Sequence, residues 1–151
     1  MAASDVGPAL ETASLVIHNC LAGRIRQINR VVTARYDEEL RAVGVTTNQL
    51  TILAVVAMLE KVTPTDLQPY LQMEMSTLSR NVARMMENHW LATLPGEDKR
   101  SHYLVVAPDG MRVLAGVRPH WERAQSWAVE HLGGVDPIRE LAWRVNPLVP
   151  R

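Results

Sequence analysis

The stretch MEMSTLSRNVARMMENHWL, residues 73–91, combines two chemistries at helical spacing. When it is drawn as a helix, one sector about 100° wide is apolar. That sector contains Met75, Leu78, Val82, Met85 and Met86. The opposite sector contains Ser76, Thr77, Arg80 and Arg84. The apolar sector predicts a buried face, and the hydroxyl and guanidinium groups opposite can contact base edges and phosphates, although an ordinary solvated helix face would look alike.

The composition is that of a folded protein. The chain has 151 residues, of which 47% are hydrophobic, enough for one compact domain or for two small modules that share a core. No apolar run approaches the roughly 20 residues of a membrane span. The start MAASDVGPALETAS lacks the basic and apolar regions of a secretory signal. We therefore expect a cytoplasmic protein without a membrane partner.

The reactive residue types are sparse and scattered. Cys20 is the single cysteine, which excludes an internal disulfide and a thiolate-rich metal site. His18 lies close before it, at a spacing that points the two side chains away from each other on a helix. We find no Ser-His-Asp order in a suitable context, no glycine-rich phosphate loop and no carboxylate pair in an apolar setting. The sequence therefore predicts no metal, no cofactor and no enzyme activity.

The net charge is zero, because 16 Lys and Arg residues balance 16 Asp and Glu residues. No global field therefore draws the chain to nucleic acid. The charges also balance over residues 74–100. Any affinity for DNA has to come from the local placement of cations and from two copies acting together. The zero net charge also leaves open an alternative to a DNA-binding protein, namely a helical interaction protein that has lost DNA binding.

Several helices are predicted before the quoted stretch. Apolar residues at spacings of three and four predict one long helix over 11–43, with Gly44 as its C-cap. The stripe consists of Ile17, Leu21, Ile25, Ile28, Val32, Tyr36 and Leu40. A short buried helix follows, capped by Thr46 or Thr47. The next helix begins in TPTDL, residues 63–67, whose threonine, proline and aspartate all favour a helix start.

The pattern changes after the quoted stretch. Two apolar strands, roughly 91–94 and 102–107, flank a charged tip and predict a β-hairpin. A helix over 109–132 follows, with Pro119 as an expected kink. A last short helix is predicted over 136–146.

This order predicts a mainly α fold with a small β-hairpin wing, an α+β winged helix-turn-helix flanked by dimerisation helices. We assign the winged helix-turn-helix to residues 46–107, and a helical dimerisation region to residues 10–44 and 108–146. The apolar stripes of the flanking helices lie outside the winged module and need a partner surface. We therefore expect a homodimer.

Three segments resemble the MarR (multiple antibiotic resistance regulator) family of transcription factors. They are RYDEELRAVGVTTNQLTIL (residues 35–53), the quoted helix, and DKRSHYLVVAPDG (residues 98–110). The most specific element is an aspartate and an arginine, Asp98 and Arg100, followed at a fixed distance by a strand and APDG. The resemblance covers about residues 15–135.

The resemblance implies a homodimeric regulator that binds double-stranded DNA at a pseudo-palindromic operator. Its recognition helix would present Ser76, Thr77, Arg80, Asn81 and Arg84 to the major groove and its backbone. Arg100 of the wing would enter the minor groove, oriented by Asp98, with Lys99 beside them. The family also implies a repressor that a small molecule releases from its operator, although the residues leave repressor and activator both open.

Further candidates concern regulation. His18 and Trp121 are candidate contacts for an aromatic or phenolic effector, although aromatic residues at helical spacing are more often core residues. Cys20 raises a thiol-based redox sensor as an alternative, since relatives that sense hydroperoxides carry a reactive cysteine in their first helix. Counted back from Gly44, theirs lies about two residues nearer the turn, on a different helix face. A small apolar residue is therefore the simpler interpretation of Cys20.

Overall fold

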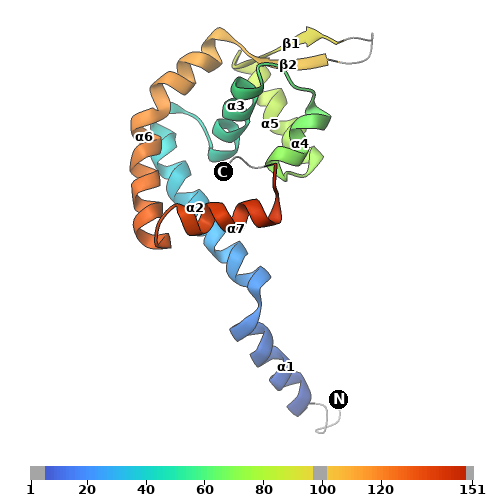
Figure 1. The fold of residues 1–151 in the computed structure, drawn as a ribbon, viewed down its shortest axis with the longest axis vertical. Coiled ribbons are helices and arrows are strands. Elements are labelled where there is room, and N and C mark those ends of the chain that lie inside the picture. Colours follow the sequence, from blue (N-terminus) through green and yellow to red (C-terminus); the bar gives the residue numbers. More distant parts are fainter. Residues whose placement is uncertain (1–5, 97–101, 149–151) are drawn as a thin grey trace. The chain divides into compact units, whose positions relative to one another are not determined.

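The computed structural model describes residues 6–96 and 102–148 (Figure 1). The chain divides into two compact units, Met1–Arg35 and Tyr36–Arg151, and each is described by itself. The predicted mainly helical fold with an antiparallel hairpin is confirmed. Within the described residues, no single helix has the length and apolarity of a bilayer span, and only the bent pair Leu21–Val43 and Thr47–Leu59 reaches that composition jointly.

The first unit contains α1, Val6–Asn19, and most of α2, Leu21–Leu40. The prediction of one continuous helix over 11–43 is wrong, because the helix is interrupted at Cys20. There the Gly23 N–H donates to Cys20 Sγ over 3.4 Å. The cysteine side chain thus acts like an N-cap and gives α2 a first turn of its own.

The second unit begins with the last turn of α2, which tightens into the 3₁₀ helix η2, Arg41–Val43. Gly44 follows as the predicted C-cap, with a φ of 71° that glycine adopts without a Cβ clash. The helix α3 spans Thr47–Leu59 and starts at a capping box, in which Thr46 and Gln49 each bond the other's backbone N–H. Local capping signals therefore set this part of the fold.

The helix α4, Pro64–Leu71, is the first helix of the helix-turn-helix. Its N-cap is Thr63, as predicted, and the Thr63 hydroxyl accepts from the Asp66 N–H at 3.1 Å. Pro69 lies inside α4 without ending it at once. The C-cap of α4 is Gln72, whose backbone is left-handed with a φ of 50°.

The helix α5, Met75–Glu87, and the hairpin complete the winged helix-turn-helix. The strands β1, Leu91–Pro95, and β2, His102–Val106, pair antiparallel. An isolated bridge between Val62 and Leu104 adds a further backbone pairing to β2, which the sequence did not predict. The hairpin is therefore attached to the segment between α3 and α4.

The helix α6, Pro108–Leu132, starts against the turn before the hairpin. A Cβ on Gly110 would collide with the carbonyl oxygen of Trp90, so only glycine permits this close approach. The helix continues through Pro119. The last helix is α7, Asp136–Val145.

The main core lies among α3, α4, α5 and the hairpin. Its buried side chains are Ile52, Leu53, Val56, Val62, Leu67, Leu78, Met85, Leu91 and Leu104. A smaller cluster of Leu40, Val45 and Val117 joins the end of α2 to α6. Each fully buried leucine or methionine contributes about 1.5–3 kcal/mol relative to an exposed one. This core fixes the orientation of α5.

Candidate nucleic-acid interface

The two faces of α5 differ in burial as the sequence predicted. Leu78 and Met85 are fully buried, and Val82 and Met86 pack half-buried against the same core. Met75 is the exception, because its side chain is 43% exposed at the start of the helix. The apolar face therefore begins at Leu78 and anchors α5 to the main core.

The polar face of α5 is partly organised by hydrogen bonds within the helix. Arg80 Nε donates to the Ser76 carbonyl at 3.2 Å, and an Arg80 terminal nitrogen lies 3.5 Å from the Thr77 hydroxyl. Asn81 Nδ2 donates to the Thr77 carbonyl at 2.9 Å. Thr77, Arg80, Asn81 and Arg84 together line an open concavity of about 220 Å³. Ser76 is exposed at the beginning of this face.

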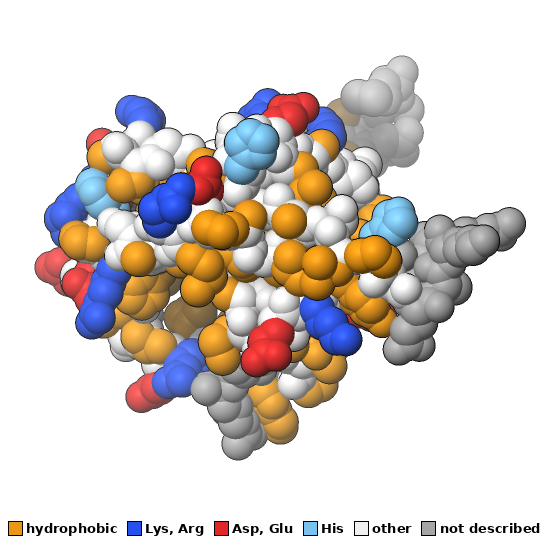
Figure 2. Space-filling model, turned by 90° about the horizontal axis from the view of Figure 1, so that it is seen from above, with side chains coloured by type: hydrophobic (Ala, Val, Ile, Leu, Met, Phe, Trp, Pro, Cys, Tyr) orange, Lys and Arg blue, Asp and Glu red, His pale blue; other side chains and the backbone are white. Residues whose placement is uncertain are grey.

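The two arginines of this face keep their charge available. Arg80 and Arg84 are exposed, and within the described residues neither is in an ion pair. A guanidinium can donate two parallel hydrogen bonds to guanine or to a phosphate. Acidic and basic side chains are interspersed on the face shown in Figure 2. Because the net charge of the chain is zero, the positive charge of Arg80 and Arg84 is a local feature.

The predicted wing contacts cannot be placed, because Asp98, Lys99 and Arg100 lie outside the described residues. The strands that lead to them are described up to the pair Pro95 and His102. The contacts of these three residues with DNA stay predictions.

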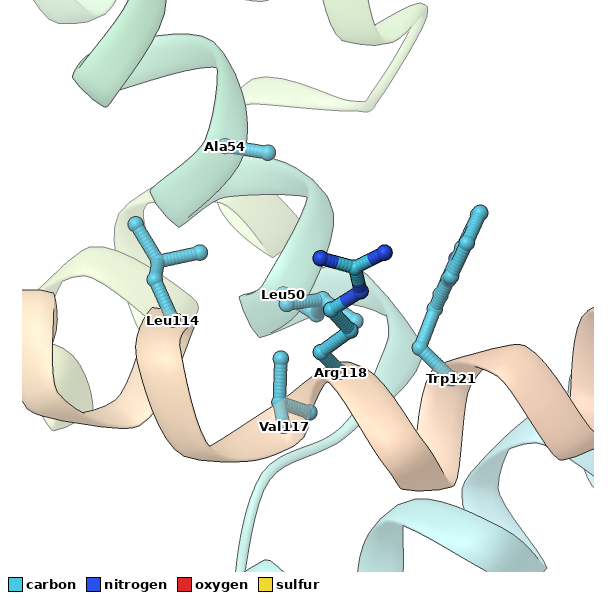
Figure 3. Close-up of a pocket in the computed structure, with 6 residues that line it drawn as sticks. All are labelled: Leu50, Ala54, Leu114, Val117, Arg118 and Trp121. Carbon is cyan, nitrogen blue, oxygen red and sulfur yellow. The ribbon is translucent and has the colours of Figure 1, made fainter.

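A pocket of about 410 Å³ lies between α3 and α6. Its lining residues are Leu50 and Ala54 from α3, and Leu114, Val117, Arg118 and Trp121 from α6 (Figure 3). Volumes of this order suit small organic ligands. The structure brings the predicted residue Trp121 to this pocket. It also adds Arg118, which the sequence reasoning missed although it lies one helical turn before Trp121.

Arg118 is the charged group of the pocket. Its Nε donates to Glu122 Oε1 at 2.7 Å, and this hydrogen bond and the charge of Glu122 raise the pKa of the guanidinium. A guanidinium is charged at any physiological pH with or without this pairing. A bound anion would share it with Glu122 or displace that carboxylate.

The other regulatory candidates, His18 and Cys20, lie in the first unit. His18 Nδ1 is 2.8 Å from the Ser14 carbonyl, a bond within α1. Cys20 is half-buried, and its sulfur accepts from Gly23 at the helix break. Among the described residues, no group of three or more His, Cys, Asp and Glu side chains could hold a metal ion.

Comparison with known proteins finds the same fold in a family model and in solved structures. Residues 45–110 match the family model of the winged helix DNA-binding domain. A mutant of MarR from E. coli, in complex with operator DNA, superposes with a TM-score of 0.74 at 19% identity, over 90% of this chain and 98% of that one. MosR from M. tuberculosis, in complex with DNA, gives a TM-score of 0.76 at 24% identity, over 85% of this chain and 95% of that one.

The chain is a winged-helix protein with the MarR fold. The fold implied by the resemblance of the three sequence segments is thereby confirmed. The MarR-fold chain is also similar in sequence to YwoH of Bacillus subtilis strain 168, described as an uncharacterized HTH-type transcriptional regulator. The two are 27% identical over 93 residues, which is 62% of this chain and 68% of YwoH.

Proposed function

We propose that this chain is a sequence-specific, DNA-binding transcriptional regulator with α5 as its recognition helix. The observation that carries the proposal is the exposed polar face of α5, where Arg80 and Arg84 have no ion-pair partner among the described residues while the opposite face is buried. The DNA complexes of MarR and MosR, and the description of YwoH as a transcriptional regulator, support it. The same relatives, which are regulators, favour a non-enzyme.

The regulator acts as a homodimer in this proposal. The described part of the first unit has no buried side chain, and its exposed apolar residues need a covering surface. These residues include Leu10, Leu15, Val16, Ile17, Leu21, Ile25 and Ile28. A second copy of the chain supplies that surface by two-fold symmetry. Two recognition helices related by that symmetry read a pseudo-palindromic operator.

The pocket between α3 and α6 is the effector site in this proposal. It is mostly apolar, with Trp121 as an aromatic wall and Arg118 as a cation. This combination suits a planar aromatic anion. Because α3 shares its buried core with α5, a ligand bound between α3 and α6 would shift α3 and with it α5. In this proposal the chain is a repressor, and binding of such a ligand releases it from its operator.

The DNA-binding proposal is tested with duplexes from the intergenic region upstream of the chain's own coding sequence. Fluorescence anisotropy should show binding at least about 10³-fold tighter to one duplex than to a shuffled duplex of equal composition. Footprinting of that duplex should give two symmetric half-sites. Equal affinity for specific and shuffled DNA at every salt concentration would refute sequence-specific recognition.

The effector proposal is tested with 4-hydroxybenzoate as a probe. Binding should change the fluorescence of Trp121 and weaken operator affinity, and Arg118→Ala should weaken the binding of the probe. Arg139→Ala serves as the control, because Arg139 is an exposed arginine of α7 paired with Asp136. Identical probe binding by Arg118→Ala and wild type would show that the pocket does not use this cation.

A further inference from the structure

We infer that Asn146 is a positioning residue for the helix-turn-helix, because it ties the end of α7 to the end of α4. Asn146 Nδ2 donates to the Pro69 carbonyl oxygen over 3.1 Å. In Figure 1, the chain leaves α7 and runs to α4 at this point. The contact itself is independent of the proposed function, and only its consequence for DNA binding rests on that proposal.

The sequence around Asn146 explains why its side chain is available. Pro147 follows, and a proline disfavours helical backbone in the residue before it. Asn146 is accordingly extended, with φ −140° and ψ 98°, while its N–H still donates to the Ala142 carbonyl at 2.8 Å. Its Oδ1 accepts from the Leu148 N–H at 3.2 Å. The backbone of Asn146 is therefore held by α7 and its Oδ1 by Leu148, which leaves Nδ2 to donate to α4.

The carbonyl that Asn146 contacts needs a donor. Carbonyl groups in the last turn of a helix have no partner within the helix. α4 ends at Leu71, so the Pro69 carbonyl belongs to this group. Two side chains donate to it, Gln72 Nε2 at 2.9 Å and Asn146 Nδ2 at 3.1 Å. The C-terminus of α4 is thus completed in part by a residue from the far end of the chain.

The end of α4 in turn sets the start of the recognition helix. Only the short turn of residues 72–74 joins α4 to α5. Gln68 Nε2 of α4 donates to the Met73 carbonyl in this turn at 3.0 Å. A displacement of the end of α4 therefore moves the first turn of α5, which carries Thr77. Asn146 thereby links the position of α7 to the polar face of α5.

The link gives the proposed dimer a way to act on the DNA-binding surface. α7 has no buried residue, and its exposed apolar side chains include Ile138, Leu141 and Val145. A second copy that packs on this face fixes the position of α7. Through its bond to the Pro69 carbonyl, Asn146 then restrains the end of α4 as well.

The variant Asn146→Asp separates the link from the local fold of the segment. The aspartate keeps an acceptor for the Leu148 N–H but places an oxygen, in place of the donor, against the Pro69 carbonyl. In hydrogen exchange of the full chain without DNA, the amides of α4 should exchange about fivefold faster than in wild type. Operator affinity should fall by a similar factor. Asn48→Ala, an exposed asparagine of α3, is the matched control and should change neither.

The outcomes separate this inference from the proposed function. Unchanged exchange of α4 in Asn146→Asp overturns the inference, whatever the DNA result. Faster exchange throughout the second unit also overturns it, because the residue would then be a general stabiliser. If α4 alone responds while wild type binds no specific DNA, the contact stands and the proposed function fails.

Discussion

The two units of the chain differ in what they bury. In the second unit, Ile52 and Leu53 are completely inaccessible within the core beneath α5. In the described part of the first unit, residues 6–35, no side chain is buried, and Leu10 and Leu15 of α1 are each 64% exposed. The second unit therefore has a core of its own, whereas the described part of the first unit exposes apolar side chains that the proposed dimer would cover. In that proposal, folding and association depend on different parts of one chain.

The largest contrast should appear in stability. Leu53→Ala removes a fully buried side chain and should lower the free energy of unfolding by about 2–5 kcal/mol. Leu15→Ala makes the same chemical change at a position that only the proposed dimer would cover, so in the monomer it should cost less than about 1 kcal/mol. Urea denaturation at protein concentrations that keep wild type and both variants monomeric measures both losses. Equal losses would mean that α1 belongs to a folding core, against the comparison.

The second contrast concerns association. Ile17 is 69% exposed in α1, and Ile17→Glu would place an unpaired carboxylate in the proposed dimer interface. We expect the dissociation constant of the dimer to rise at least tenfold, since burying such a charge costs several kcal/mol. Met58→Glu, at a position 83% exposed in α3, is the control and should leave the dimer intact. Sedimentation velocity over a range of micromolar concentrations measures the dissociation constant of wild type and of both variants. A monomeric wild type would refute the dimer.

A smaller effect should appear at alkaline pH. The Tyr36 hydroxyl donates to Gln125 Oε1, and burial raises the pKa of this phenol above its usual 10.0. Because the folded-state pKa is the higher one, the contribution of the neutral phenol is complete below pH 10 and is lost as the pH rises through the folded value. Tyr36→Phe should cost about 1 kcal/mol at pH 7. The deficit should shrink above pH 10, and a deficit that stays constant to pH 11 would contradict this assignment.

The smallest effect is expected at the break between α1 and α2. In Cys20→Ser, the hydroxyl can accept from the Gly23 N–H in place of the sulfur, as serine does at N-caps. Stability should change by less than about 0.5 kcal/mol. Operator binding and effector release should be unchanged in gel-shift titrations. If hydroperoxide released wild type from DNA but did not release Cys20→Ser, the redox alternative would be established.

The sequence predicted the features that depend on near neighbours. The cap residues Gly44 and Thr63 act on their own helix ends, so residue type and position were enough. For α3 the sequence left Thr46 and Thr47 open, and the structure selects Thr46. The buried face of α5 followed from periodicity in the same way. The break at Cys20 was missed because apolar periodicity continues across it, and the sulfur contact found at the break leaves no mark in that pattern.

The features that were missed depend on distant parts of the chain. The bridge between Val62 and Leu104 joins segments whose pairing is set by the core and not by either local pattern. Arg118 becomes a pocket residue only because α6 packs beside α3. The bond from Asn146 to Pro69 likewise exists only after α7 and α4 have been brought together. Such contacts leave no periodic signal in the sequence.

In the proposed function, α5 recognises DNA through its polar face. Operator affinity of wild type, Arg80→Ala and Arg112→Ala, measured by anisotropy at several salt concentrations, tests it most directly. Arg112 is the control, an exposed arginine of α6 paired with Asp109. Arg80→Ala should lose about 1–3 kcal/mol at the operator, and less on shuffled DNA, while Arg112→Ala binds as wild type does. Wild-type affinity in Arg80→Ala, at every salt concentration, would contradict the assignment of α5 as the recognition helix.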